Sequence, residues 1–252
     1  MKNGKGFWGL LGLAMVVFLH WSAASLGAKE ILIGFTGPMS GPAAEYGQDC
    51  FNGAAMAVKE INESGGIKFN GETYTFKLEK LDDRIDPVQA INNARRLRAS
   101  GAIAVFNPAF ITISSLLKIN EEKGNEFLVM GYTTSPRTVQ IPNKLRLIIT
   151  TTLLSYVYPN AELAWAQGSR KAAMLVTVGG YGDEWKGAFK AYWEKKGGTI
   201  TADKSANYYT ETDFSAPLTA ILATKPDIIV AGGPTATTAL VIEQARAMGY
   251  KN

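Results

Sequence analysis

Short apolar runs alternate with amphipathic stretches along most of the chain. An apolar run at residues 31–35 predicts a buried strand, a glycine-rich loop follows at 36–42, and a helix is expected over 43–63, ended by glycines at 65 and 66. Most strands of this half are continuous apolar runs, which is typical of a parallel sheet covered on both faces. The other expected elements are strands at 74–81, 102–106 and 127–130 and helices at 86–100 and 114–123.

A second alternation begins near residue 145. It predicts strands at 145–150, 172–178, 199–202 and 227–231, and helices at 156–167, 183–196, 213–223 and 235–248. Two such halves indicate an α/β protein with two lobes, lobe one over residues 29–147 and lobe two over 148–252. Residues 249–252 stand where another strand is expected, so we expect the sequence to be truncated at its C-terminus.

The N-terminus has the pattern of an export signal over residues 1–28. Lys2 and Lys5 precede an apolar run at 7–19, and small residues follow at 22–28. The run is shorter than the roughly 20 residues that a membrane span needs, which favours cleavage after Gly27 or Ala28 over a membrane anchor. We therefore expect the mature protein in the periplasm.

The residue inventory excludes several kinds of catalytic site. The chain has 252 residues, with one cysteine and one histidine, and His20 lies in the predicted signal. Histidine-dependent triads and histidine zinc sites are therefore excluded from the mature chain.

The net charge of +4 falls to about +2 without Lys2 and Lys5, and the basic residues are scattered. The cluster at 95–98 lies on a predicted amphipathic helix, so a solvated helix face is favoured over nucleic-acid binding. We expect no catalytic residues, metal or cofactor.

Two polar or glycine-rich segments have possible chemistry. Gly34, Gly37 and Gly41 do not have dinucleotide-binding spacing, so the loop either packs tightly or frames a ligand crevice at the strand ends. The acidic run at 82–86 lacks the spacing of a calcium loop and is interpreted as a strand-end turn and a helix N-cap. Cys50, with no histidine to activate it, is interpreted as a buried structural thiol.

Short motifs occur in a fixed order over the whole mature chain. They are residues 33–42, 45–47, 52–55, 60–62, 65–67, 82–83, 86–87, 133–136, 181–182, 213–215, 227–233 and 244–246. In that order they resemble the branched-chain amino-acid (leucine-binding) family of type I periplasmic binding proteins, the substrate-binding receptors of ABC transporters. The resemblance implies two Rossmann-like lobes with parallel sheets that close on a ligand like a Venus flytrap.

The resemblance also implies where a ligand is held. Two lobe-one segments would hold a carboxylate through hydroxyl and backbone N–H groups, and aromatic side chains of both lobes would enclose the ligand. The loop at 107–112 lacks the family's usual serines, and the family's acidic partner for an ammonium group would lie beyond Asn252. Packing aromatics and turn hydroxyls are the alternative readings. The residues implied are Tyr46, Phe110, Ile111, Thr112, Tyr132, Thr133, Thr134 and Tyr181, with Thr235 at the position of a lobe-two aromatic.

These observations favour a receptor that captures an amino acid or similar small polar ligand and delivers it to a membrane permease. A ligand-sensing receptor or regulator of the same fold, responding to an amide or an amino acid, is the alternative. An enzyme with a nucleotide-binding fold is disfavoured, because both the dinucleotide fingerprint and a mature histidine are missing.

Overall fold

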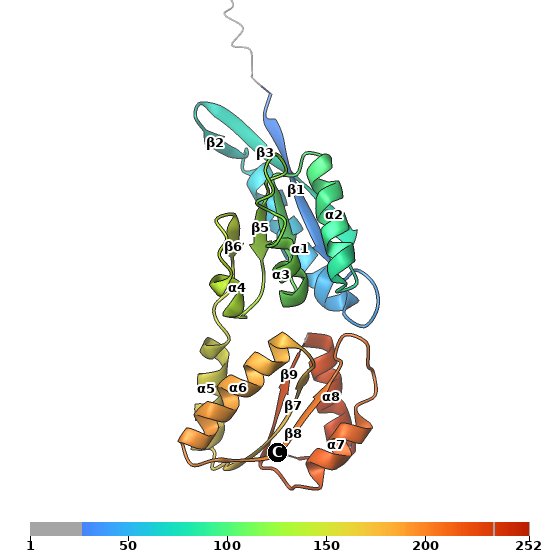
Figure 1. Ribbon diagram of the computed structural model, residues 1–252, viewed down its shortest axis with the longest axis vertical. Coiled ribbons are helices and arrows are strands. Elements are labelled where there is room, and N and C mark those ends of the chain that lie inside the picture. The colour runs from blue at the N-terminus through green and yellow to red at the C-terminus, as the bar shows by residue number, and fades with distance from the viewer. Residues whose placement is uncertain (1–26, 234, 252) are drawn as a thin grey trace, which may run out of the picture.

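The strands form two sheets that lie at opposite ends of an elongated chain (Figure 1). The structure, a computed structural model, describes residues 27–233 and 235–251. The predicted export signal therefore lies almost wholly outside the described residues. We refer to residues 29–148 as lobe one and to residues 154–251 as lobe two, joined by the connection at 149–153.

Lobe one is built on a six-stranded sheet. All neighbouring strands are parallel except the pair at one edge, which forms a short antiparallel hairpin. In sheet order the strands are β2 (Ile67–Phe69), β3 (Glu72–Asp82), β1 (Lys29–Gly37), β4 (Ala104–Asn107), β5 (Leu128–Gly131) and β6 (Arg146–Ile148), and the helices are α1 (Ala44–Glu63), α2 (Pro87–Ala99), α3 (Phe110–Leu116) and α4 (Arg137–Gln140).

The two faces of this sheet are packed differently. Because strand residues alternate between faces, Val105 packs under α2 and α3 while Phe106 faces α1. The α2 and α3 side is closely packed around fully buried side chains such as Leu97 and Ile113. The α1 side holds an apolar cavity of about 670 Å³, and Gly47 is the one buried residue of α1.

Lobe two is built on a three-stranded parallel sheet with two helices on each face. Its central strand is an uninterrupted run of buried residues from 172 to 177, as a strand covered on both faces should be. In sheet order the strands are β8 (Thr199–Ala206), β7 (Lys171–Thr177) and β9 (Ile228–Gly232); α5 (Leu154–Ala166) and α6 (Gly180–Lys195) cover one face, and α7 (Ser215–Leu222) and α8 (Thr235–Ala247) cover the other.

The expected α/β class with parallel sheets in two lobes is confirmed. The glycine stop of α1 is confirmed as well: Gly65 and Gly66 have positive φ, and their N–H groups bond the last carbonyls of the helix. Asp86 caps α2 as expected, its carboxylate accepting from the N–H of Gln89 at 2.8 Å.

Two expectations about local structure were wrong, and one element was missed. The helix expected at 114–123 is α3 and starts four residues earlier, because the side chain of Asn107 bonds its first turn. The strand expected at 145–150 to open the second half is β6, which pairs with β5 in the first sheet. The β2–β3 hairpin, which turns at Asn70 and Gly71 with positive φ at both, was not anticipated.

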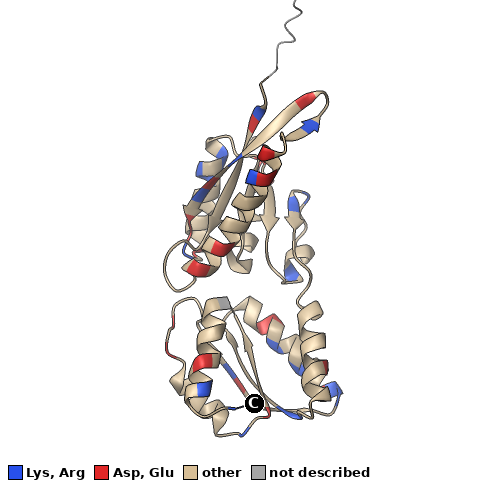
Figure 2. Cartoon of the chain, turned by 180° about the vertical axis from the view of Figure 1, so that it is seen from behind, with Lys and Arg blue, Asp and Glu red and all other residues tan. Residues whose placement is uncertain are grey.

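Charged residues of both signs are interspersed over the two lobes (Figure 2). Within the basic cluster on α2, Arg95 lies 3.5 Å from Glu122, and Arg98 donates to the carbonyl of Glu126 at 3.0 Å. These contacts match the solvated helix face expected from the sequence. Among the described residues, no helix combines the length and the apolar character that crossing a membrane requires.

Candidate binding cleft between the lobes

The carboxyl ends of the parallel strands in both lobes lead into loops that meet between the two sheets. Open α/β sheets bind small molecules at this end of their strands. A pocket of about 170 Å³ lies there, and residues of both lobes and of the connection form its walls. Its lining residues are Tyr46, Pro108, Ala109, Phe110, Tyr132, Thr133, Thr134 and Thr150, with Tyr181, Tyr209 and Gly233 from lobe two.

Each lobe places a tyrosine at this pocket through the same local structure, a buried glycine that lets a helix contact the backbone closely. Tyr46 lies in the first turn of α1 and Tyr181 in the first turn of α6, and each is followed by a buried glycine. A Cβ on Gly47 would stand 1.8 Å from the carbonyl oxygen of Pro38, and one on Gly182 would stand 1.6 Å from that of Thr177. The missing side chains let each helix rest directly on the backbone, and that close approach holds the preceding tyrosine at the cleft.

Hydrogen bonds fix both tyrosines. The hydroxyl of Tyr46 donates to the carbonyl of Pro108 at 2.8 Å, so this ring is tied to the loop after β4, and burial raises its pKa well above the ordinary value. The Oγ1 of Thr134 donates to the hydroxyl of Tyr181 at 3.2 Å. This bond crosses the cleft from lobe one to lobe two.

A second polar contact joins the lobes beside the pocket. The Nε of Arg137 lies 3.5 Å from Oε1 of Glu184, and its guanidinium lies over the ring of Phe110, 5.3 Å from the ring centre. Burial raises the pKa of Glu184, while Ser135 and Arg137 act in the opposite direction. The contact therefore connects the Phe110 wall of the pocket to α6.

Most residues implied by the sequence lie together in this pocket. Tyr46, Phe110, Tyr132, Tyr181 and the Thr133–Thr134 pair line it, which makes six residues brought together from four separate segments. Their contacts with a ligand remain a prediction.

Three of the implied residues do not contribute to the pocket walls described. Ile111 is 50% exposed on α3. Thr112 is fully buried, and its hydroxyl bonds Asn107 Oδ1 at 2.7 Å and the carbonyl of Ala109 at 3.0 Å, so the helix turn directs it into lobe one. Thr235 is the first residue of α8, and its side chain lies outside the described part of the chain.

Tyr209 is the main lining residue that sequence reasoning missed. It lies in the turn after β8, where its N–H donates to the side chain of Asn207 at 3.0 Å, and burial raises its pKa strongly. β8 runs to Ala206, four residues past the end expected from the sequence. A correctly placed strand end would have put Tyr209 in a cleft loop.

The pocket is suited to binding by neutral hydrogen-bonding groups. Threonine and tyrosine residues line it, and none of its eleven lining residues carries a formal charge at neutral pH. Hydroxyl and backbone N–H donors suit a carboxylate removed from water, and aromatic walls exclude water around it. Cys50 lies in the apolar cavity beside α1, where burial raises its pKa to about 11, so it is a protonated thiol at neutral pH.

The comparisons with known proteins agree with this arrangement. Residues 30–252 match a family described as periplasmic binding protein. Relatives include the Leu/Ile/Val-binding protein BraC3 of Rhizobium johnstonii, 29% identical over 83% of this chain and 56% of that protein. The Leu/Ile/Val-binding protein of Escherichia coli K12 is 27% identical over 95% of this chain and 64% of its own length. The chain thus spans less than two thirds of either relative.

Solved structures show the same fold. A leucine binding protein of Thermotoga maritima superposes with a TM-score of 0.74 at 21% identity, over 88% of this chain and 61% of that one. A solute binding protein of an ABC transporter from Rhodopseudomonas palustris, in complex with 4-hydroxybenzoate, gives a TM-score of 0.72 at 20% identity over the same shares.

Proposed function

Because this chain belongs to the periplasmic binding protein family, we propose that it forms the ligand-capturing part of a solute receptor for an ABC importer. The receptor binds an amino acid or a similar small polar compound between its lobes and presents it to a permease in the inner membrane. Its role is binding rather than catalysis. The branched-chain amino-acid resemblance of the sequence is consistent with the names of its relatives.

The cleft itself carries this proposal, because both lobes contribute polar groups to one pocket. Thr134 and Tyr181 stand on opposite walls and reach each other at 3.2 Å. A ligand held by both walls interacts better with the closed arrangement than with an open one, so it shifts the population towards closure. A permease that recognises the closed form then detects the loaded receptor.

The donors of the cleft support a small carboxylate as ligand. The hydroxyls of Thr134, Tyr181 and Tyr209 are neutral donors or acceptors, and tyrosine rings supply flat apolar walls. Leucine, isoleucine and valine give the relatives their names, and a structural neighbour holds 4-hydroxybenzoate. These compounds share a carboxylate beside an apolar body.

Calorimetry on the full-length protein tests the proposal with leucine, isoleucine, valine and 4-hydroxybenzoate as titrants. Thr134→Ala removes a cleft hydroxyl worth on the order of 1.5 kcal/mol to a charged partner, so the affinity for the bound compound should fall about tenfold. Thr219→Ala is the matched control, because Thr219 is exposed on α7 and bonds only its own helix. Equal affinities for the two variants would remove the Thr134 turn from the binding site.

The gene neighbourhood tests the transport half of the proposal. Genes for a permease and an ATPase beside this one support an importer. A neighbouring gene for a signalling or transcriptional output protein would instead support a sensor of the same fold.

A further inference from the structure

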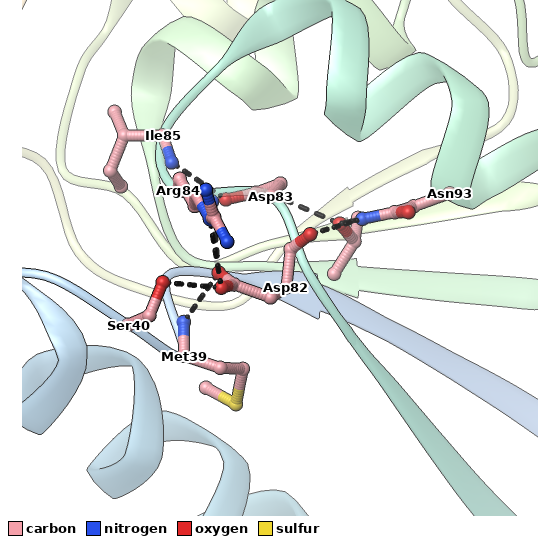
Figure 3. A network of polar contacts seen from close by, with 8 residues as sticks. Met39, Ser40, Asp82, Asp83, Arg84, Ile85 and Asn93 are labelled. Atoms are coloured by element: carbon pink, nitrogen blue, oxygen red, sulfur yellow. Dashed lines mark hydrogen bonds and ion pairs between the residues drawn. The ribbon is translucent and has the colours of Figure 1, made fainter.

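A buried polar network lies below the cleft in lobe one, where β1, β3 and β4 end. Its centre is Asp83, which directly follows β3 (Figure 3), and the residue is fully buried. Its Oδ2 accepts from the hydroxyl of Thr36 at 3.2 Å and from Nδ2 of Asn107 at 3.0 Å, and its Oδ1 accepts from the N–H of Ile85 at 2.9 Å. Three segments of lobe one therefore converge on one carboxylate.

The turn that carries this carboxylate has an unusual backbone. Arg84 and Ile85 both have left-handed φ, 52° and 61°, a region that a β-branched residue such as Ile85 rarely adopts. Each N–H of the pair bonds a carboxylate two residues earlier, Arg84 to Asp82 at 3.0 Å and Ile85 to Asp83 at 2.9 Å. The Oδ1 of Asp82 also accepts from the N–H of Met39, so the turn is joined to the glycine-rich loop (Figure 3).

Asn107 links this network to the cleft wall. Its Nδ2 donates to Asp83 and, at 2.7 Å, to the carbonyl of Thr36. Its Oδ1 therefore faces the other way, where it accepts from the N–H of Ala109 at 3.0 Å and from the hydroxyl of Thr112 at 2.7 Å. Because an amide has a donor side and an acceptor side, the all-acceptor carboxylate of Asp83 and the carbonyl of Thr36 together determine which side meets the first turn of α3.

We propose that Asp83 is a positioning residue for the cleft: through the amide of Asn107 it holds the segment 108–112, and with it the Pro108–Phe110 wall, in the binding-competent arrangement. The residue touches no ligand. The proposal rests on the function proposed for the cleft, and it adds a specific group outside the pocket that controls the shape of the lobe-one wall.

The ionised carboxylate is unfavourable for stability, which argues that its role lies in binding. Burial and, to a smaller extent, the neighbouring Asp82 raise the pKa of Asp83, while the hydrogen bonds from Ile85, Thr36 and Asn107 lower it, and the resulting pKa is about 6. The carboxyl binds a proton more readily in the folded than in the unfolded chain, so its protonation stabilises the fold fully below the unfolded pKa of 3.8, and this contribution is lost as the pH rises through about 6. At neutral pH the chain thus keeps a charge that opposes folding.

Asp83→Asn tests the proposal in the full-length protein. The new amide cannot accept at both of its ends. It places its NH2 either against Nδ2 of Asn107 and the hydroxyl of Thr36 or against the N–H of Ile85, and in both cases the network that holds Asn107 loses hydrogen bonds. We expect amide hydrogen exchange across 107–116 to become at least about tenfold faster, and the affinity for leucine, used as the probe, to fall about tenfold, with unfolding stability at pH 7 unchanged or higher. Asp86→Asn, the same exchange of groups at an exposed N-cap, should leave both readouts unchanged.

A pH series separates positioning from a purely structural role. In the unmodified protein, exchange across 107–116, corrected for intrinsic rates, should accelerate as the pH falls with a midpoint near 6, and Asp83→Asn should remove the midpoint. The unmodified profile decides the case even where the variant does not fold. Exchange in Asp83→Asn equal to that in Asp86→Asn, or a profile without a midpoint near 6, would overturn the proposal. Exchange needs no ligand, so a failure to bind leucine counts against the proposed function alone.

Discussion

Two glycines of α6 allow a sharp test of how the second tyrosine is held at the cleft. Gly182 is buried in the first turn, where an added Cβ would stand 1.6 Å from the carbonyl oxygen and 2.8 Å from the carbonyl carbon of Thr177. Gly187 lies one and a half turns further along the same helix, is exposed, and would meet nothing within 4 Å. Gly182→Ala and Gly187→Ala therefore make the same chemical change in opposite environments.

The expected magnitudes follow from these contacts. Real Cβ atoms essentially never approach closer than 3.0 Å, so α6 would have to move by roughly 1.5 Å away from the backbone of the central strand β7. Overpacking of this kind destabilises by about 1–3 kcal/mol, and a backbone obstacle places Gly182→Ala at the upper end. Gly187→Ala should stabilise by about 0.5–1 kcal/mol, the usual gain of alanine over glycine in an exposed helix. The two variants should differ by about 3–4 kcal/mol.

Urea unfolding followed by tryptophan fluorescence measures this difference in lobe two, which contains α6. All the tryptophans that the structure describes, Trp165, Trp185 and Trp193, lie in lobe two. In thermal unfolding followed by the same fluorescence, a chain of this size shifts by about 2–4 °C per kcal/mol, so the melting temperatures of the two variants should differ by about 10 °C. Ligand affinity should fall only in Gly182→Ala, because α6 carries Tyr181. Equal stabilities for the two variants would refute the close-approach argument.

Two smaller predictions concern the lobe contact and the N-terminus. Arg137→Ala removes the ion pair to Glu184. Because the Arg137 side chain is 52% exposed, ligand affinity should fall no more than about fivefold. A larger loss in calorimetry would mean that this pair dominates closure. N-terminal sequencing of the periplasmic fraction should find a chain that begins at Ala28 or Lys29, and a retained Met1 on a membrane-bound species would contradict the export signal.

Element order was predictable from the sequence because buried parallel strands leave a strong apolar signal. The run at 172–177 is the clearest case, and it is buried throughout in β7. The start of α3 was not predictable, because its first turn is held by the side chain of Asn107 from the preceding strand. The β2–β3 hairpin did have a local signal, the Asn70–Gly71 turn, but β2 is only three residues long and forms no apolar run.

The site was partly predictable for a similar reason. A tyrosine followed by glycine occurs in the first turn of α1 in lobe one and in the first turn of α6 in lobe two, and this repeat is visible in the sequence at Tyr46 and Tyr181. Asp83 was visible only as part of an acidic run. Its role depends on Asn107, 24 residues later in the chain at the end of β4, which β1 separates from β3 in the sheet, and nothing local in the sequence records that pairing.

The energies across the cleft indicate how binding controls the two lobes. The side-chain polar contacts between the described parts of the lobes include the neutral Thr134–Tyr181 hydrogen bond at 3.2 Å and the Arg137–Glu184 pair at 3.5 Å, in which Arg137 is 52% and Glu184 is 11% exposed. Such contacts contribute about 1 kcal/mol each at most, and together they favour closure by less than about thirtyfold. The walls themselves are held by close backbone contacts at Gly47 and Gly182 and by the hydrogen bonds of the buried Asp83. With weak bonds between the lobes, the ligand of the proposed receptor would supply most of the preference for closure, as a receptor that is recognised in its closed form requires.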